Sequence, residues 1–574
     1  MNQARLVLAA VLVGLTGCLT PPTTPRSQSE DADTAGRHEV QTVGDITAFS
    51  NTDPIPVSGV GLVYNLAGTG HSPPGTYREM LETELKRDGF ENAREILDSP
   101  NQALVLVSAV IPPGARKGDP LDVVVTLPQG SKTRSLRGGI LAECRLHTYN
   151  TPASMRADRL LLGNTLARAK GPLVLPPPKG APADPDPAGD AAPGESELTA
   201  QVWGGGVCLE NRPLYLVMNL GYQRSRLTAD IAGRVNMAFQ GPGPGDELAV
   251  AKTNEVIWLN VPARYRLNLP RFMRAVRMVP IKAVPENHPY RYRLEQEVLD
   301  PAHAVTAALR LEALGPGSVK ALKPGLQSAS PLVRFACAEA LAYLGEPCCG
   351  EELARLAVEY PILQAYCLTA LGSLNEAVSF VKLQELLACD RPEVRYGAFR
   401  ALRELDERAD AVRGERLNDS FWLHRVAPHS PPLVHMLTGK RAEVVLFGEA
   451  PRLNPPFSYL VGRDFTVTAG VTDDRCTVSR FSVHTGTDRR QCSTELAEIL
   501  RTLAEMGATY ADVVDLLRQA DEYRSLSCPL AVDAMPGGVD VETLAELGRR
   551  DPNLTRADPA LLKAGGEEEA EAPG

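Results

Sequence analysis

Residues 59–70, "GVGLVYNLAGTG", have the glycine density of a loop that could hold a phosphate. Glycine-rich turns bring backbone N–H groups close to an anion. A dinucleotide fingerprint needs a third glycine where this sequence has Tyr64, and a P-loop needs a lysine where it has His71. The spacing therefore excludes a nucleotide site and predicts a role in backbone conformation or close packing for four glycines: Gly59, Gly61, Gly68 and Gly70.

The other residues that could support catalysis or metal binding are incompletely arranged. "GHSPP" at 70–74 resembles a nucleophile elbow, but Pro74 occupies the position of its second glycine. Nine histidines show no metal-binding spacing. Three of them stand in proline-rich surroundings and are predicted to face solvent: His424, His429 and His435. The sequence therefore predicts no catalytic residue, no metal site and no cofactor, and it favours a protein that is not an enzyme.

The first eighteen residues predict export. Arg5 precedes an apolar run at 6–15, which is too short for a bilayer span of about 20 residues but has the proportions of a secretory signal. The run ends in Leu-Thr-Gly-Cys and is similar to a bacterial lipobox, in which the cysteine becomes the lipidated first residue. An ordinary signal peptide with an incidental cysteine is the alternative. We expect a lipid on Cys18 and a periplasmic protein anchored to the outer membrane, because Leu19 follows in place of Asp.

Net charge argues against one class of protein, and the cysteines indicate a possible disulfide. The 574 residues carry a formal net charge of −10, which argues against a nucleic-acid binder. Export makes disulfides possible for the cysteines that follow Cys18. Cys476 and Cys492 flank a predicted strand and turn, and they are the pair best placed to form one.

Changes in composition along the chain predict its organisation. Short β-branched runs bounded by Pro and Gly indicate strands, and Met80, Leu81 and Leu85 ahead of Gly89 indicate a helix. We predict eight segments: a signal peptide at 1–17, a flexible tether at 18–39, an α+β domain at 40–170, a Pro/Ala/Asp-rich disordered insert at 171–199, a central α+β domain at 200–298, helical repeats at 299–410, strands and a helical pair at 411–535, and an acidic tail at 536–574.

The helical segment has an internal period. Prolines at 301, 331, 361 and 392 are 30, 30 and 31 residues apart, and Ala-Leu recurs at the same offset after three of them. A period near 30 in two-helix units is typical of a solenoid, here resembling short HEAT-like repeats. The Ala/Leu stripes are interpreted as core.

The glycine stretch resembles a motif of the bacterial flagellar P-ring protein family. "VSGVGLVYNLAGTG" follows that family's run G-x-G-L-V-x-x-L-x-G-T-G, with Asn65 at a usual glycine and His71 at a usual aspartate. "PPGARKGD", "DVVV" and "SLRGG" follow in the family's order, and "SRLTADIAGRVNMAF" and the helical pair ending near 526 are similar to its central and closing helices. The resemblance covers roughly 40–170, 200–285 and 435–532. The fold class expected is α+β, with discontinuous P-ring-like domains and an inserted all-α HEAT-like solenoid.

This resemblance implies a structural role in the periplasm. P-ring subunits assemble into a homo-oligomeric ring around the flagellar rod, beneath the L-ring and at the peptidoglycan layer, and they support motility without an active site. Rod, L-ring proteins and peptidoglycan are thus the implied partners. Five basic residues in two turns are candidates for a contact surface, with solvated turns as the alternative: Arg116, Lys117, Lys132, Arg134 and Arg137. The alternative function is a lipid-anchored adaptor that binds a partner through its HEAT-like repeats.

Overall fold

The computed structural model describes residues 40–150, 161–175, 198–239, 247–418, 420–439, 441–471, 473–482, 486–551 and 554. The predicted signal peptide, Cys18, the tether, the body of the 171–199 insert and the acidic end of the tail lie outside these ranges. Helices and sheets both occur within them, which confirms the α+β class. None of the helices in the described ranges combines the length and apolar content needed to cross a bilayer.

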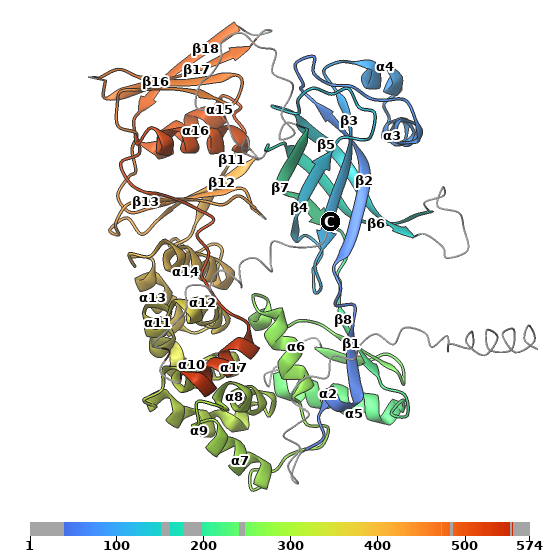
Figure 1. Cartoon of the computed structure of the whole chain (residues 1–574), viewed down its shortest axis with the longest axis vertical. Coiled ribbons are helices and arrows are strands. Elements are labelled where there is room, and N and C mark those ends of the chain that lie inside the picture. Colours follow the sequence, from blue (N-terminus) through green and yellow to red (C-terminus); the bar gives the residue numbers. More distant parts are fainter. Residues whose placement is uncertain are drawn as a thin grey trace, which may run out of the picture. The chain divides into compact units, whose positions relative to one another are not determined.

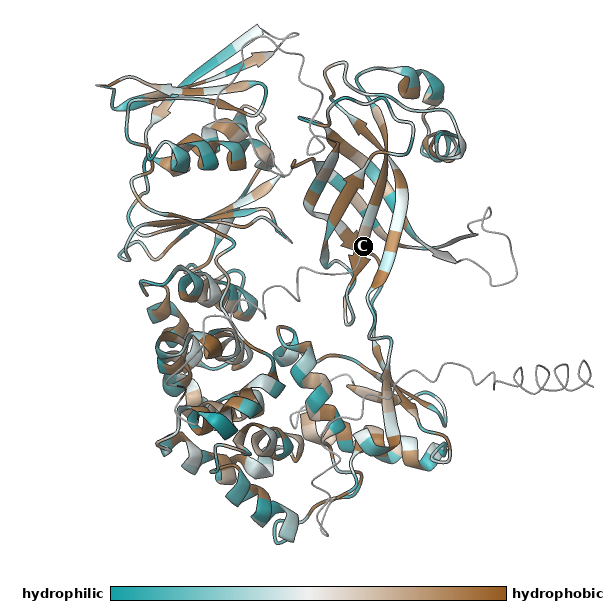
Figure 2. Ribbon diagram, viewed as in Figure 1, coloured by the Kyte–Doolittle hydropathy of each residue, from teal (hydrophilic) through white to brown (hydrophobic). Residues whose placement is uncertain are grey.

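Strands between residues 55 and 208 form a closed six-stranded barrel (Figure 1). Hydrophobic positions run through these strands (Figure 2), and their inward side chains, such as Val105 and Val107, are completely buried. The barrel confirms the β-branched runs that predicted strands here. In spatial order its strands are β2 (Ile55–Tyr64), β3 (Ala103–Ile111), β4 (Pro120–Thr126), β7 (Thr199–Cys208), β6 (Leu161–Pro172) and β5 (Ile140–Asn150).

Two helices pack on the outside of the barrel: α3 (Thr76–Arg87) and α4 (Ala93–Asp98). Leu81 and Leu85 of α3 are buried in one cluster with Leu104 of β3. Gly89 follows α3 with φ of 92°, a left-handed conformation that ends a helix at low cost. The helix predicted from this apolar spacing is therefore confirmed.

A second sheet lies where the chain enters and leaves the barrel. Its strand order is β1-β8-β10-β9, and β1 (Thr47–Ser50) runs antiparallel to β8 (Leu214–Met218) with Ser50 opposite Tyr215. The barrel is thus inserted between two neighbouring strands of this central sheet. The remaining elements here are β9 (Ala249–Ala251), β10 (Val256–Leu259), α2 (Val43–Ile46), α5 (Ser225–Phe239) and α6 (Leu269–Arg277).

Arg212 binds both chain crossings between the barrel and the central sheet. The residue lies in the connection between β7 and β8, and it is 8% exposed. Nε donates to Asn51 Oδ1 at 3.1 Å, Nη1 donates to the Ile111 carbonyl at 2.8 Å, and Nη2 donates to the Asp53 carbonyl. One guanidinium therefore ties the entering chain, the leaving chain and the end of β3 together.

Residues 289–405 are almost entirely helical. Pro331 and Pro392 are the first residues of their helices, Pro361 opens a short 3₁₀ turn before the next helix, and Pro301 lies in the turn before another. The helices expected from these prolines are present, and their interpretation as a HEAT-like solenoid stays a prediction. The helices are α7 (Pro289–Glu297), α8 (Ala304–Ala313), α9 (Val319–Leu322), α10 (Pro331–Leu344), α11 (Gly350–Glu359), α12 (Gln364–Ser373), α13 (Ala377–Leu386) and α14 (Pro392–Leu405).

The C-terminal part returns to strands. A mixed sheet has the order β11-β12-β14-β13-β19, and an antiparallel sheet has the order β15-β16-β17-β18. Both share one hydrophobic core with two helices. The elements are β11 (Gly414–Leu417), β12 (Phe421–Val426), β13 (Leu433–Met436), β14 (Glu443–Phe447), β15 (Phe457–Val461), β16 (Phe465–Ala469), β17 (Arg475–Ser482), β18 (Gly486–Ser493), β19 (Leu530–Val532), α15 (Leu496–Glu505) and α16 (Tyr510–Glu522).

One helix here was predicted with its cap, and another was missed. Thr509 caps α16 as expected, with its N–H and hydroxyl both donating to Asp512 Oδ2. Beyond the helical pair, α17 (Val541–Arg550) lies inside the segment interpreted as an acidic tail. It packs on α8, and Gly548 lets its backbone approach the Pro301 carbonyl, which an added Cβ would meet at 2.3 Å.

Cys476 and Cys492 are expected to form a disulfide under oxidising conditions. They stand opposite each other in β17 and β18 as free, buried thiols with their Sγ atoms 3.3 Å apart. A cross-link closing a loop of this length stabilises a protein by about 3 kcal/mol. Peptide mapping after oxidation should recover a peptide pair linked through these two cysteines, and Cys476→Ala should remove it. Two alkylatable thiols at these positions after complete oxidation would contradict the prediction.

Candidate functional site

The glycine motif begins inside the barrel wall. Gly59 and Gly61 lie in β2, which pairs with β3 and with β5. A Cβ added to Gly59 would lie 2.3 Å from the Arg145 carbonyl oxygen of β5, and one added to Gly61 would lie 2.8 Å from Val107 Cγ2. Side chains at these two positions would therefore push neighbouring strands apart, so both glycines lie where neighbouring atoms leave no room for a Cβ.

The motif ends in a loop at 65–71 that follows β2. Gly68 has φ of 75° with open space around its Cα, whereas a Cβ on Gly70 would lie 2.2 Å from the Gln102 carbonyl oxygen. Asn65, at the position where the resemblance expects glycine, has φ of 68°, and its Nδ2 donates to the Gly138 carbonyl at 3.1 Å. Asparagine tolerates this left-handed conformation better than most side chains do. Gly68 thus serves conformation and Gly70 serves close packing.

Backbone N–H groups of this loop donate hydrogen bonds to other parts of the protein. The N–H of Leu66 donates to the Asn101 carbonyl, the N–H of Gly68 donates to Asn101 Oδ1, and the N–H of Gly70 donates to the Pro100 carbonyl, at 2.8–3.0 Å. His71 N–H donates to Thr133 Oγ1 at 3.1 Å. A phosphate cradle needs free N–H groups that converge on one point. The loop instead uses these donors to hold neighbouring chain segments.

The basic residues predicted as one contact surface are divided between the two ends of the barrel. Strand directions place the turn at 127–139 beside the glycine loop, because the start of β5 pairs with the end of β2. Three exposed basic residues share this end of the barrel: Lys132, Arg134 and Arg137. The two segments are joined directly, since Arg134 N–H donates to the Thr69 carbonyl at 2.9 Å and Lys132 N–H to His71 Nδ1 at 3.1 Å.

The other two basic residues lie at the opposite end, in the turn between β3 and β4. Arg116 Nη2 donates to the Val261 carbonyl at 2.6 Å, which ties this turn to the segment after β10. Lys117 is exposed, and its N–H donates to Asn211 Oδ1. The guanidinium of Arg116 therefore already has an intramolecular partner.

A buried ionic cluster, absent from the sequence-based prediction, joins α6 to the helical segment. Arg271 of α6 forms ion pairs with Glu312 of α8, at 2.6 Å, and with Glu339 of α10. Tyr265 also donates to Glu312, at 2.7 Å, and its ring stacks on Tyr343 at 4.6 Å. All five residues are at most 8% exposed. The sequence carries one sign of this cluster, a lone glutamate within each of two apolar helices, at "RLEAL" and "CAEAL". A charged residue in such surroundings is rarely buried without a partner.

Burial perturbs the carboxyl groups of this cluster. Desolvation raises the pKa of Glu312, against the lowering effect of Arg271. Desolvation also raises the pKa of Glu339 to about 7, and Arg271 offsets only part of that effect. Glu339 Oε1 has no hydrogen-bond partner among the described residues, which fits a carboxyl group that binds a proton readily.

We expect Glu339→Gln to change the pH dependence of stability. The folded-state pKa of Glu339 lies above its unfolded value, so the folded protein binds the extra proton and loses stability as pH rises from about 4.5 to about 7. The neutral glutamine can still accept from Arg271. The variant should match the wild type near pH 5 and exceed its melting temperature near pH 8. Equal differences at the two pH values, measured by differential scanning fluorimetry, would contradict the shift.

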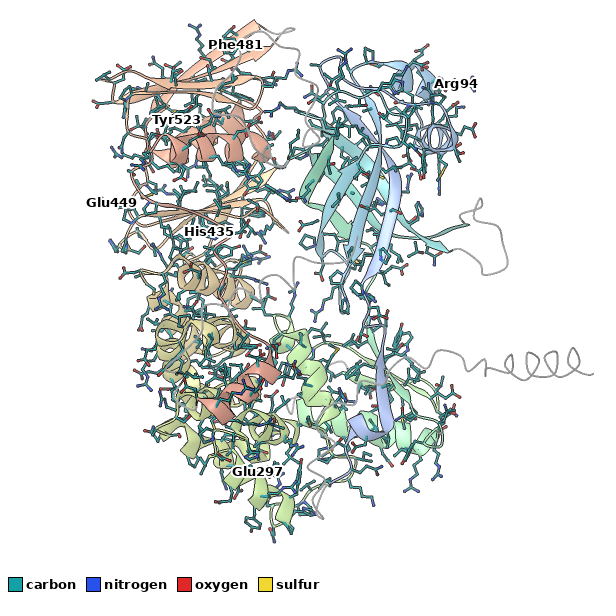
Figure 3. All side chains as sticks on the ribbon, in the orientation of Figure 1. Arg94, Glu297, His435, Glu449, Phe481 and Tyr523 are labelled. Atoms are coloured by element: carbon teal, nitrogen blue, oxygen red, sulfur yellow. The ribbon has the colours of Figure 1, made fainter. Side chains whose placement is uncertain are left out.

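A second buried cluster joins α14 to the C-terminal sheet and corrects the interpretation of the histidines. His424 is 1% exposed and His435 is completely buried (labelled in Figure 3), so the prediction that they face solvent was wrong for both. Of these three histidines, only His429 is exposed. The proline-rich context suggested a surface loop, but β12 and β13 place these two side chains against α14, where His435 stacks on Tyr396 at 3.8 Å.

Glu443 is the centre of this second cluster. It is completely buried in β14, accepts from Tyr396 Oη at 2.6 Å and pairs with Arg403 and Arg441. Burial lowers the pKa of His435 to about 4 and lowers that of His424, so both rings are neutral near pH 7. In the described part of the chain no three His, Cys, Asp or Glu side chains are grouped as metal ligands.

Comparison with known proteins finds similarity in one part of the chain. Residues 42–288 match the family model described as flagellar P-ring protein. The flagellar P-ring protein of Oleidesulfovibrio alaskensis is 28% identical over 248 residues, which cover 42% of this chain and 60% of that relative. The proteins of that name from Leptospira interrogans and Geotalea uraniireducens are 36% identical over 104 residues and 38% identical over 100. These stretches cover 18% and 17% of this chain, and 28% and 27% of those relatives.

The matched region has a clear limit in the structure. The chain spans 60% of the length of the first of these relatives, and less of the other two. The family match includes the glycine motif, the barrel and the central sheet, and it ends at residue 288, directly before α7 begins. The further resemblance at 435–532 lies outside this match and stays a prediction.

Proposed function

We propose that this chain is a structural subunit of a ring around the rod of the flagellar basal body, because residues 42–288 match the flagellar P-ring protein family. The proposal rests on the family match across the barrel and the central sheet. It implies a homo-oligomer in the periplasm that supports motility, with rod and L-ring proteins, and peptidoglycan, as neighbours. The occupied N–H groups of the glycine loop support a structural role rather than an enzymatic one.

In this proposal the remaining segments adapt a ring subunit. The helices at 289–405 act as an inserted HEAT-like stack, supported by the regular proline spacing and by the end of the family match at 288. The strands and helical pair after 411 complete a discontinuous P-ring-like body. Exposed Lys132, Arg134 and Arg137 beside the glycine loop are the favoured contact surface for a neighbouring subunit or an anionic polymer. The comparisons do not favour the alternative of an adaptor protein.

Electron microscopy of basal bodies tests the proposed function. A strain without the gene should lack the periplasmic ring and should not swim, and a wild-type copy should restore both. A copy carrying Gly70→Val should be exported but should fail to restore the ring, because the added side chain meets the Gln102 carbonyl. Intact rings and normal swimming in the strain without the gene would overturn the proposal.

Replacing the proposed lipid attachment site should release the protein from the membrane. Cys18 lies at the lipobox position, so Cys18→Ser removes the acceptor sulfur and should give an unlipidated protein. We expect the wild type in the membrane fraction and the variant in the soluble periplasmic fraction or as an unprocessed precursor. Metabolic labelling with a radioactive fatty acid supplies the direct readout. Equal labelling and fractionation of the two proteins would contradict the lipid anchor.

A further inference from the structure

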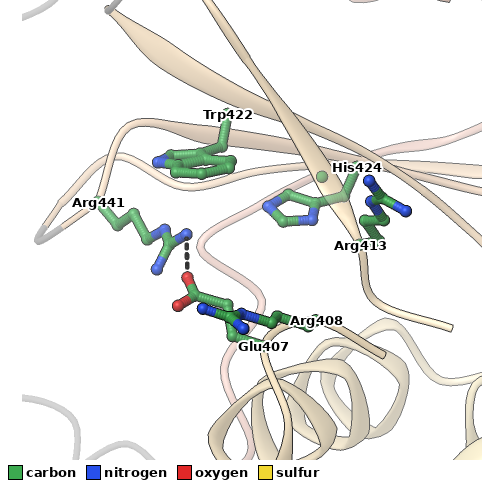
Figure 4. A pocket seen from close by; sticks show the side chains of 7 residues that line it. Glu407, Arg408, Arg413, Trp422, His424 and Arg441 are labelled. Carbon is green, nitrogen blue, oxygen red and sulfur yellow. Dashed lines mark hydrogen bonds and ion pairs between the residues drawn. The ribbon is translucent and has the colours of Figure 1, made fainter. Parts of the chain in front are cut away.

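A pocket lies where the helical segment joins the C-terminal mixed sheet. Its walls come from the connection after α14, from the strands β11 and β12, and from the connection that precedes β14, and its volume is about 460 Å³ (Figure 4). The side chains that line it are Glu407, Arg408, Arg413, Trp422, His424 and Arg441. Three arginines and one glutamate therefore line the pocket, in a chain whose net charge is −10.

The positive charge of this pocket is only partly compensated. Arg441 is neutralised, because Nη2 pairs with Glu407 at 3.1 Å and Nε pairs with Glu443 at 3.2 Å. Arg408 and Arg413 are exposed, and neither guanidinium has a carboxylate partner among the described residues. A guanidinium presents a planar fork of donors that matches a carboxylate or a phosphate. Two such forks without a carboxylate partner thus belong to residues that line the pocket.

The other wall of the pocket is flat and fixed. Trp422 is half-buried, and the Arg441 guanidinium lies 4.9 Å from the centre of its ring. His424 is held by a hydrogen bond of 2.8 Å between Nδ1 and the Val412 carbonyl. Gly414 leaves room for that ring, since an added Cβ would lie 2.4 Å from His424 Cε1. The pocket therefore combines free cations with a rigid aromatic surface.

We propose that this pocket binds a small organic anion, with carboxylate or phosphate groups on Arg408 and Arg413 and its carbon skeleton against Trp422. The volume falls in the range of about 300–1,000 Å³ typical of small-molecule sites. It greatly exceeds the roughly 30 Å³ that one water molecule occupies in the liquid, so a bare inorganic ion would leave most of the pocket unfilled. The inference is independent of ring assembly, because it concerns residues outside the 42–288 match.

Isothermal titration of the full-length protein tests the proposal with three probes. Citrate represents a polycarboxylate, fructose 1,6-bisphosphate represents an organic phosphate, and inorganic phosphate represents the bare ion. We expect one equivalent of citrate or of the bisphosphate to bind at least about tenfold more tightly than inorganic phosphate, a difference of about 1.4 kcal/mol. The tighter of the two organic probes identifies the charged group. Failure of both to bind, or equal binding of inorganic phosphate, would overturn the proposal.

Variants assign the binding to this pocket. Arg408→Ala combined with Arg413→Ala should weaken the organic anion at least about tenfold, since both charge-assisted contacts are lost. Arg425→Ala is the matched control, because Arg425 lies on β12 next to a pocket residue but pairs with Glu495 and does not line the pocket. Ligand-dependent tryptophan fluorescence should disappear in Trp422→Phe, which retains Trp203 and Trp258. Unchanged affinity in the double variant, or equal weakening in the control, would place the binding elsewhere.

Discussion

Replacing Arg271 with leucine is expected to destabilise the protein by about 3–5 kcal/mol, because removing one member of a buried ion cluster leaves the others uncompensated. Glu312 and Glu339 would remain 1% and 3% exposed without their cation. Urea unfolding followed by circular dichroism at 222 nm, which reports on the helical segment, should show the loss as an earlier transition.

Two further variants separate the role of this cluster from general damage. Arg274→Ala, in the same helix α6, breaks an exposed pair with Glu542 and should cost less than about 1 kcal/mol. Replacing Arg271, Glu312 and Glu339 together by leucine should recover much of the loss, since no buried charge remains. An Arg271→Leu protein as stable as the Arg274→Ala protein would contradict the prediction.

Gly70→Val is expected to cost about 3 kcal/mol or more, as overpacking against backbone does when nothing can move aside. The added Cβ would lie 2.2 Å from the Gln102 carbonyl oxygen, and the chain at 100–102 is itself held by hydrogen bonds from the loop. Gly59→Val should have a comparable effect on the barrel, because its Cβ would lie 2.3 Å from the Arg145 carbonyl oxygen. Thermal unfolding of the purified variants measures both losses.

Gly68→Ala is the matched control within the same loop. Its φ of 75° disfavours a side chain by about 1–2 kcal/mol, but no atom lies within 4 Å of the new Cβ. The three variants should therefore rank with Gly68→Ala as the mildest. If Gly68→Ala proves as damaging as Gly70→Val, backbone conformation rather than close packing dominates throughout the loop, and the assignment for Gly70 is wrong.

Elements with a strong local signal were predictable from the sequence. The barrel strands β2, β3 and β4 are β-branched runs bounded by Pro and Gly, and α3 and α16 have apolar spacing together with stop or cap residues. Strand β18 had no such signal: six of its eight residues are exposed, and it exists because it pairs along its length with β17. Helix α17 was also missed, because its packing on α8 decides its structure and the acidic composition of the surrounding sequence does not.

Some features of the candidate site were likewise predictable from the sequence, and others were not. Spacing alone showed that the glycine motif lacks the residues of a nucleotide site, because Tyr64 stands in place of a glycine and His71 in place of a lysine. Which glycine serves conformation and which serves close approach depends on β5 and on residues 100–102, whose positions follow from long-range pairing. The buried clusters around Arg271 and Glu443 depend on contacts between helices and strands far apart in the chain, so the sequence held only isolated charges in apolar surroundings.

The insertion of the barrel between β1 and β8 determines how the molecule carries mechanical load. A force that pulls the barrel away from the central sheet acts on two adjacent strands at once, since the chain crosses at Ser50 and again at Tyr215. The two connections between the barrel and the sheet share this force, and the hydrogen bonds of Arg212 link one connection to the other. A single flexible linker would allow the barrel to swivel, whereas this double crossing resists torsion. Such a joint suits the proposed role as a subunit of a ring around the rod, because that role requires a rigid body.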